Sequence, residues 1–246
     1  MSDLRHNIET SPLDSLSAAI GNIAQNDGDF TTAIGALSLH RRNTPTSPVH
    51  CIYQMGLGVV AQGAKQIMLA GKPTCYRAGE SLLTAVDLPV VSHVTQASAE
   101  QPFLGLMLVL DPQTVAQMAA VIPPALAVRE APVTPLLVEP LDQALADALL
   151  RLVNLLAEPT LIAHVAPLIQ QEIIVRLLTG PYSSQMRQMA TKGTSGQQMM
   201  NKNLDASSAA LFVGYESASQ FSREYSREFG ESPLRDIRRL RTEGES

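Results

Sequence analysis

The chain has 246 residues, of which 45% are hydrophobic, so it is long enough to bury one large core or two smaller ones. Its formal net charge of −5 at pH 7 and its pI of about 5.5 exclude a basic field over the whole molecule, and any contact with nucleic acid must come from a local patch. The N-terminus lacks a basic segment followed by an apolar one, and the clean apolar runs are short. These features predict a cytoplasmic protein without a secretion signal or a membrane span.

Hydrophobic periodicity separates a short helical segment from a β-rich region within residues 12–110. Residues 12–26 carry leucines and isoleucines at helical spacing, which predicts a short amphipathic helix. Many short apolar or alternating runs separated by turn residues follow up to Leu110, and this pattern is typical of a β-sandwich or barrel with an apolar pocket. The expected strands are Ala33–Leu39, Cys51–Met55, Val59–Val60, Gln66–Leu69, Thr74–Tyr76, Ser81–Ala85, Val90–Val94 and Leu104–Leu110.

Helices are predicted again after the strands. Residues 113–122 read as a helix, and the proline-rich residues 123–140 as a connector. Leu141–Ala157 and Leu161–Leu178 each carry a broad leucine stripe, which indicates either packing within the chain or a coiled-coil-like dimer seam. The polar residues 181–203 predict a linker.

The C-terminal segment has the pattern of a helix-turn-helix. Asp205 is suited to cap a short helix that ends before Gly214, a second helix spans residues 217–229, and Ser232-Pro233 is suited to begin a third. Short helical hairpins are common, so this pattern alone is a weak indication of DNA binding. The polar outer face of the second helix carries Ser217, Ser219, Gln220, Arg223 and Arg227.

The string AALFVGYESASQFSREYSREFGESPLRDIRRLR makes the indication specific, because it resembles the second helix-turn-helix of AraC-type (AraC/XylS) transcription regulators. The matching positions are Val213, Gly214, Tyr215, Ser217, Phe221, Arg223, Tyr225, Phe229, Gly230, Ser232 and Pro233. The segment HRRNTPTSPVHCIYQMGLGVVAQGAKQIMLAGKPTCYRAGESLLTAVDLPVVSHV resembles the cupin-like N-terminal domain of one AraC-type subfamily. The resemblance implies that Ser217, Ser219, Gln220, Arg223 and Arg227 face DNA.

The chain departs from the family pattern before this string. AraC-type regulators have two helix-turn-helix units joined by a long helix, and no apolar periodic block for the first unit lies between Leu178 and Asn203. We interpret this as an internal deletion of the first unit. Loss of half of the phosphate and base contacts predicts strongly weakened specific DNA binding.

The predicted fold is therefore mixed α and β and multidomain, with an N-terminal cupin-like β-barrel, flanking helices and a C-terminal all-α helix-turn-helix remnant. The predicted parts are a cupin-like effector-sensing domain (1–135), a helical dimerisation or support segment (136–180), a linker (181–203) and the second helix-turn-helix (204–246). The predicted function is an effector-responsive DNA-binding transcriptional regulator with impaired DNA binding. The alternative is a ligand-binding and dimerisation module without autonomous DNA binding, which acts through mixed dimers.

The expected partners are promoter DNA, a small organic effector, a second copy of the chain and RNA polymerase. An aldehyde effector is implied only by analogy with the subfamily. No cofactor, metal or membrane is expected, and the absence of catalytic motifs argues against an enzyme.

The β region contains three histidines and two cysteines of the types that bind metals or respond to oxidation. His40, His50 and His93 with Glu80 lack the H-x-H…E spacing of a metal-binding cupin, so we expect no metal there. Cys51 and Cys75 are suited to a redox sensor or one disulfide, but apolar neighbours favour two buried thiols.

Overall fold

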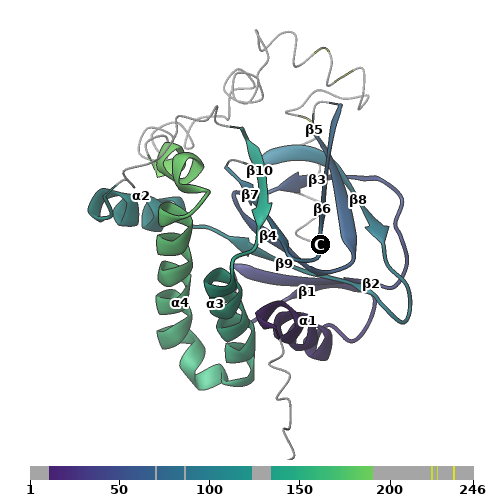
Figure 1. The fold of residues 1–246 in the computed structure, drawn as a ribbon, viewed down its shortest axis with the longest axis horizontal. Helices are drawn as coiled ribbons and strands as arrows, with labels where there is room; N and C mark the ends of the chain where they lie inside the picture. The colour runs from purple at the N-terminus through teal and green to yellow at the C-terminus, as the bar shows by residue number, and fades with distance from the viewer. Residues whose placement is uncertain are drawn as a thin grey trace, which may run out of the picture.

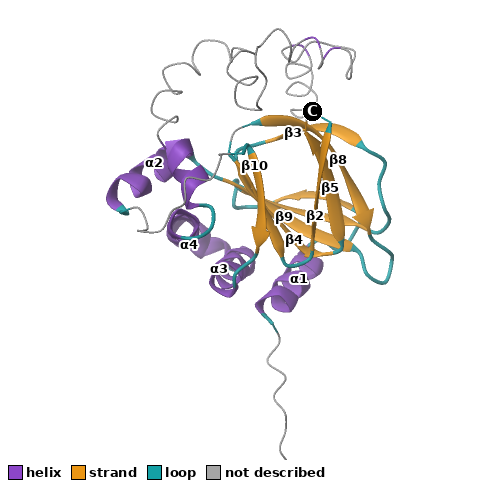
Figure 2. Cartoon of the chain, turned by 45° about the horizontal axis from the view of Figure 1, so that its top comes forward, coloured by secondary structure: helices purple, strands orange, loops and turns teal. Residues whose placement is uncertain are grey.

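The computed structural model describes residues 11–69, 71–85, 87–123 and 134–190, together with Arg223, Ser226 and Arg235. The described ranges form two antiparallel sheets that face each other as a barrel, with helices on the outside of one sheet (Figures 1 and 2). The larger sheet has the order β1 (Gly28–Thr31), β2 (Leu37–Arg42), β9 (Phe103–Val109), β4 (Gly56–Gln62), β7 (Glu80–Thr84) and β10 (Leu136–Pro140). The smaller sheet has the order β3 (Val49–Tyr53), β8 (Leu88–Gln96), β5 (Ala64–Leu69) and β6 (Lys72–Arg77).

The helices begin where the sequence supplies a capping side chain. Ser11 caps α1 (Pro12–Ile23), Asp111 caps α2 (Pro112–Val121) and Asp142 caps α3 (Gln143–Asn154), and each side chain accepts a hydrogen bond from a backbone N–H of the first turn. A short 3-10 helix, η1 (Leu155–Ala157), leads to α4 (Pro159–Thr179), which begins with a proline at its first position. The helices predicted between residues 12 and 178 and the mixed α and β fold class are confirmed, whereas the helices predicted after residue 203 lie outside the described residues.

The larger sheet is buried on both faces, and this explains where the core lies. Side chains on its outer face pack against α1, α3 and α4 in the main core cluster, which includes Leu57, Val59 and Leu106. Side chains on its inner face pack against the smaller sheet in a second cluster, made of Val60, Ile67, Tyr76, Leu82, Leu88, Val90, Val94 and Phe103. Because both faces of β4 are buried, its sequence lacks the alternation of apolar and polar residues that marks a half-exposed strand. The sequence therefore predicts only its centre, Val59–Val60, as a strand.

Gly63 allows the chain to pass from one sheet to the other between β4 and β5. It adopts a φ of 83°, which a glycine tolerates at little cost. A Cβ atom there would lie 2.5 Å from the carbonyl oxygen of Gln96 and 3.1 Å from the Cα of Phe103. The corner therefore brings β4, β8 and β9 together at one edge of the barrel.

The leucine stripe of α3 belongs to the intrachain core. Leu145, Leu149 and Leu152 are at most 3% exposed, and α3 packs between α1 and α4. Among the two alternatives left open by the sequence, the structure supports packing within the chain. These three side chains are therefore not free to contact a second copy, and a dimer that uses another surface stays a prediction.

Two segments that were expected to be irregular are ordered. Residues 136–140 of the predicted connector form β10, which pairs with β7 at the end of the larger sheet. Residues 183–190, within the predicted linker, are helical, and Tyr182, Met186 and Met189 are buried. Their polar and methionine-rich sequence lacks a clear period, so the apolar residues were not recognised as a packing face.

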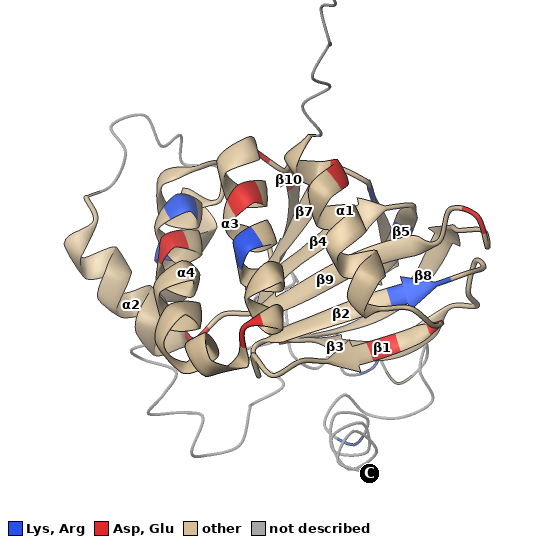
Figure 3. Ribbon diagram, turned by 90° about the horizontal axis from the view of Figure 1, so that it is seen from below, with Lys and Arg blue, Asp and Glu red and all other residues tan. Residues whose placement is uncertain are grey.

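By length and composition, α4 is long and apolar enough to cross a membrane, which corrects the expectation that every apolar run is too short. Helices in the core of globular proteins meet the same criterion. Ile173, Ile174 and Leu177 are buried, and Glu172 on the same helix pairs with Arg151 of α3 and with Arg176. Figure 3 shows that basic and acidic residues lie on the neighbouring helices α3 and α4. The apolar residues of α4 are therefore accounted for in part by contacts with the rest of the chain.

Replacement of Leu149 by alanine tests the role of α3. The side chain is fully buried, so Leu149→Ala should lower the free energy of unfolding by about 2–5 kcal/mol, measured by urea denaturation. The matched control is Leu168→Ala on α4, where the leucine is 63% exposed and the change should stay within about 0.5 kcal/mol. Equal losses in both variants would contradict the packing described here.

Candidate functional site

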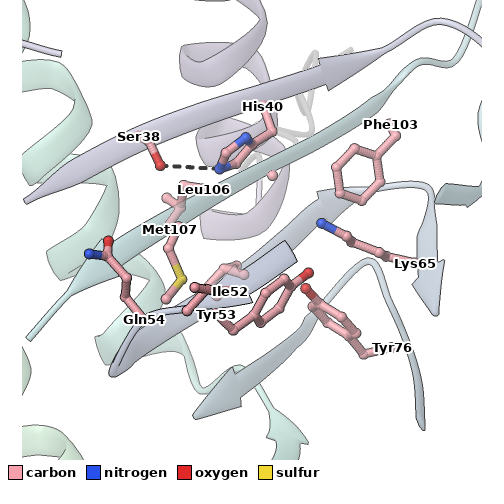
Figure 4. Close-up of a pocket in the computed structure, with 13 residues that line it drawn as sticks. Ser38, His40, Ile52, Tyr53, Gln54, Lys65, Tyr76, Phe103, Leu106 and Met107 are labelled. Atoms are coloured by element: carbon pink, nitrogen blue, oxygen red, sulfur yellow. Dashed lines mark hydrogen bonds between the residues drawn. The ribbon is translucent and has the colours of Figure 1, made fainter. Parts of the chain in front are cut away.

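A cavity of about 220 Å³ lies between the two sheets (Figure 4). Gly58 of β4 and Gly105 of β9 belong to its lining, and a Cβ atom at Gly58 would meet nothing closer than 3.6 Å, so this glycine leaves space that a larger side chain would fill. Aromatic and aliphatic side chains make most of the wall, and a few polar groups reach into it. The lining residues are Ser38, His40, Ile52, Tyr53, Gln54, Gly58, Val59, Lys65, Tyr76, Phe103, Gly105, Leu106 and Met107.

Lys65 brings a cation into this apolar space. Its ammonium nitrogen lies 5.3 Å from the ring centroid of Tyr53 and 6.0 Å from that of Phe103. The faces of aromatic rings attract a cation, and this partly offsets the loss of water. No carboxylate of the described residues lies within ion-pair distance of Lys65. The cavity therefore offers a cation to a ligand.

Two tyrosines stand beside the lysine. The hydroxyl of Tyr53 lies 3.0 Å from that of Ser92, and burial raises the pKa of both Tyr53 and Tyr76. Both phenols therefore stay neutral at physiological pH, where they offer a hydroxyl and the edge of a flat ring. Such groups orient a ligand without adding charge.

Ser38, His40 and Asp29 form a continuous polar chain at one side of the cavity. The Nε2 atom of His40 lies 3.1 Å from the Oγ of Ser38, and its Nδ1 atom lies 2.7 Å from a carboxylate oxygen of Asp29. Arg42 donates to both oxygens of Asp29 at 2.8 Å. The hydrogen bond from His40, together with Arg42, holds the pKa of Asp29 well below its ordinary value, although partial burial opposes the shift.

The two cysteines are free thiols. Cys51 is partly buried, and loss of water around it raises the pKa of its thiol, so it is mostly protonated near neutral pH. Cys75 is exposed on β6 at the edge of the smaller sheet, so the expectation of two buried thiols is wrong for this residue. The residues next to Cys75 in the sequence do not indicate which face of this edge strand is exposed to solvent.

The residues considered as metal ligands do not form a common site. His40 lies in the polar chain described above, whereas the carboxylate of Glu80 accepts a hydrogen bond from the backbone of Arg77. Within the described ranges, no three of His, Cys, Asp and Glu converge on a point that could hold a metal ion.

The predicted DNA-facing residues fall almost wholly outside the described residues. Arg223 is described, and it is helical and exposed. Ser217, Ser219, Gln220 and Arg227 lie outside, as does the region of the interpreted deletion. These assignments stay predictions.

Sequence reasoning did not connect the polar groups of the cavity, and it considered His40 only as a metal ligand. Ser38 and His40 are two residues apart on one strand, so they share a face once the strand is known, and that spacing was available in the sequence. Lys65 and Tyr53 come from different strands of the smaller sheet, and no local signal relates them.

Asp29→Asn tests the electrostatic part of the site. A carboxylate whose pKa is lowered by folding stabilises the folded state above its unfolded pKa of about 3.9, and this contribution is lost as the pH falls further. Because the Asp29 side chain is 62% exposed and screened by water, we expect a loss of about 1 kcal/mol at pH 7 in urea denaturation.

The difference between wild type and Asp29→Asn should narrow as the pH is lowered from 5 towards 3. A constant difference over this range would show that the ionised carboxylate contributes nothing.

Comparison with known proteins gives one family and several distant structural neighbours. The model of the AraC-type transcriptional regulator N-terminus matches residues 33–185. No curated protein matches the chain.

Among solved structures, apo ToxT from Vibrio cholerae is 9% identical with a TM-score of 0.34, covering 83% of this chain and 98% of its own. The AraC-like activator CuxR is 16% identical with a TM-score of 0.33, covering 85% and 77%. YhaK from Escherichia coli is 18% identical with a TM-score of 0.28, covering 50% and 55%. At these identities and TM-scores the neighbours determine neither a ligand nor a function.

Proposed function

Because the chain belongs to the AraC-type transcriptional regulators through its N-terminal domain at residues 33–185, we propose that its barrel senses a small organic effector for a transcriptional response. The family consists of regulators of transcription rather than enzymes. The observation that carries the proposal is the cavity between the sheets, which combines apolar walls with the ammonium of Lys65. We place the protein in the cytoplasm, where such a regulator meets DNA.

The lining favours one class of effector. Rings of Tyr53, Tyr76 and Phe103 accept a flat, unsaturated body, and Lys65 donates to an electron-rich oxygen. Small aromatic or unsaturated carboxylates meet both requirements, and the carbonyl oxygen of an aldehyde meets the same donor more weakly. A cavity of about 220 Å³ limits the effector to a small molecule.

A second part of the proposal concerns DNA. The C-terminal segment resembles a single helix-turn-helix, whose face carries Ser217, Ser219, Gln220, Arg223 and Arg227. One paired contact between a side chain and a base discriminates by only about 1–3 kcal/mol, which does not replace a whole reading helix. We therefore propose binding to promoter DNA that is weakened relative to a two-unit regulator.

The alternative function is a sensing module that acts through mixed dimers, without autonomous DNA binding. A dimer would have to use a surface other than the leucine stripe of α3, because that stripe is buried. A contact with RNA polymerase is part of the proposed regulator function, because it requires the protein to be bound at a promoter.

Gly58 provides a sharp test of the cavity. A Cβ atom at Gly58 would lie 3.6 Å from the hydroxyl of Tyr76 and 3.8 Å from the sulfur of Met107, which is ordinary contact. Gly58→Ala should therefore fold and bind, whereas Gly58→Leu should fill the cavity. The probes are benzoate, cinnamate, benzaldehyde and cinnamaldehyde, and the readouts are thermal shift and calorimetry.

We expect Gly58→Leu to weaken binding at least about tenfold, or about 1.4 kcal/mol, relative to Gly58→Ala. Lys65→Met should weaken the carboxylates more than the aldehydes, since it removes the charge. Undiminished binding to Gly58→Leu would place the effector elsewhere, and failure of every probe on the wild type would contradict the proposed class.

DNA binding is tested by titrating the purified chain against a promoter fragment at several salt concentrations. We expect affinity near the non-specific level, with a Kd on the order of 10⁻⁴–10⁻⁶ M at physiological salt. The control is a chimera that joins residues 1–190 to a complete two-unit AraC-type module. Nanomolar, sequence-selective binding by the chain alone would contradict the proposed weakening.

A further inference from the structure

We propose that Ser38, His40 and Asp29 form a nucleophilic site in the cavity, at which Ser38 takes the acyl group from small carboxylic esters. This activity uses the same cavity as the proposed effector, but it requires no transcriptional response. The residues meet the geometric criterion for an activated nucleophile, namely a nucleophile within reach of a base that is oriented by a third group.

The arrangement follows from strand pairing. Asp29 of β1 is the direct cross-strand partner of His40 of β2, and Ser38 lies two residues before His40 on the same face. The hydroxyl oxygen of Ser38 and the Nε2 of His40 are 3.1 Å apart, and the Nδ1 of His40 is 2.7 Å from Asp29. Figure 4 shows the side chains of Ser38 and His40 turned towards each other at the wall of the cavity.

The direction of the hydrogen bonds suits a base. Arg42 and His40 together keep Asp29 ionised, and an ionised carboxylate can only accept hydrogen bonds. The Nδ1 of His40 must therefore carry the hydrogen. In the neutral ring, Nε2 then has a free lone pair that accepts the proton of Ser38, as the base of a Ser-His-Asp triad does.

A purely structural role explains only part of the cluster. A cross-strand ion pair stabilises the edge of a sheet and accounts for Asp29, His40 and Arg42. It does not account for the position of Ser38 and His40 on the wall of a cavity. The residue opposite His40 on β9 is Gly105, which lines the same cavity and packs against the ring of Phe103.

The cavity also defines the substrate class. Its volume of about 220 Å³ admits a short acyl group, and Ile52 and Met107 supply an apolar wall for it. Lys65 lines the same cavity and offers a positive charge to the oxygen that becomes negative during attack. Small esters of short-chain acids satisfy these conditions.

The reaction balances without a redox step. The Ser38 oxygen attacks the acyl carbon as its proton moves to Nε2 of His40, and this proton then passes to the departing alkoxide, which leaves as an alcohol. Water attacks the acyl-Ser38 ester, His40 takes the proton of that water and returns a proton to Ser38, and the carboxylic acid leaves. The products are one acid and one alcohol from one ester and one water.

The experiment uses the full chain with p-nitrophenyl acetate and p-nitrophenyl butyrate. Release of p-nitrophenol is followed by absorbance, and mass spectrometry of the digested protein identifies the acylated residue. We expect acylation at Ser38 that is lost in Ser38→Ala, with the rate reduced by at least about 100-fold, the lower range for an acid–base contribution. Ser38→Cys keeps a nucleophile and should keep acyl capture.

The matched control is Ser98→Ala. The hydroxyl of Ser98 donates to the carboxylate of Glu100, and Ser98 lies in an exposed loop outside the cavity, so its replacement should not change the rate. Gly58→Leu should block acylation at Ser38 by filling the cavity. Asp29 is a positioning residue, and in Asp29→Asn the amide favours the wrong tautomer of His40, so the rate should fall and its pH profile should change.

A folded wild type that is never acylated at Ser38, or equal rates for wild type and Ser38→Ala, would overturn the proposal. Thermal melting establishes that each variant is folded, and Ser38→Cys carries the test if Ser38→Ala does not fold. The outcome is independent of effector sensing, because benzoate and cinnamate binding is measured without any ester.

Discussion

The structure depends on a sheet that must bury both of its faces. In the larger sheet, β4 has almost no exposed residue, so helices have to cover one side and the smaller sheet the other. The outer face is covered by helices that include α1 and α3 (Figure 1), and buried apolar side chains of these helices belong to the main core cluster. On the inner face, packing is incomplete around Gly58, and the space left over belongs to the cavity. The site is thus a consequence of an incompletely filled core.

The polar groups of the cavity are held by partners from other strands. Tyr53 is fixed by Ser92 on β8, His40 by Asp29 on β1, and Lys65 by the rings of Tyr53 and Phe103. Each of these contacts lowers the cost of placing a polar group away from bulk water. These contacts also restrict rotation of the side chains. A ligand that enters therefore costs little further loss of side-chain entropy, which favours tight binding of a small molecule.

The helical residues 183–190 connect this barrel to the chain beyond it. The hydroxyl of Tyr182 donates to the carbonyl of Ser81 on β7 at 2.7 Å, and burial raises the pKa of Tyr182 to about 12, so the hydroxyl stays a donor. Arg187 donates to the carbonyls of Ala119, Ile122 and Pro123 at the end of α2. Ser81 is the register partner of Val59 on β4, so the start of this segment lies one strand away from the cavity.

The sequence by itself determined the elements whose signals are local. Caps, glycine turns and apolar periodicity predicted α1 to α4, most of the strands and the fold class, and a specific string carried the family resemblance. Tertiary structure alone decided what the leucines of α3 contact, because a stripe packs equally well on its own domain or on a second copy. Tertiary structure also decided that residues 136–140 form a strand, because this strand at the end of the sheet is defined by its hydrogen bonds to β7. It also assembled the cavity, because Lys65, Tyr53 and His40 meet only when non-local strands pair, and no spacing along the chain encodes that meeting.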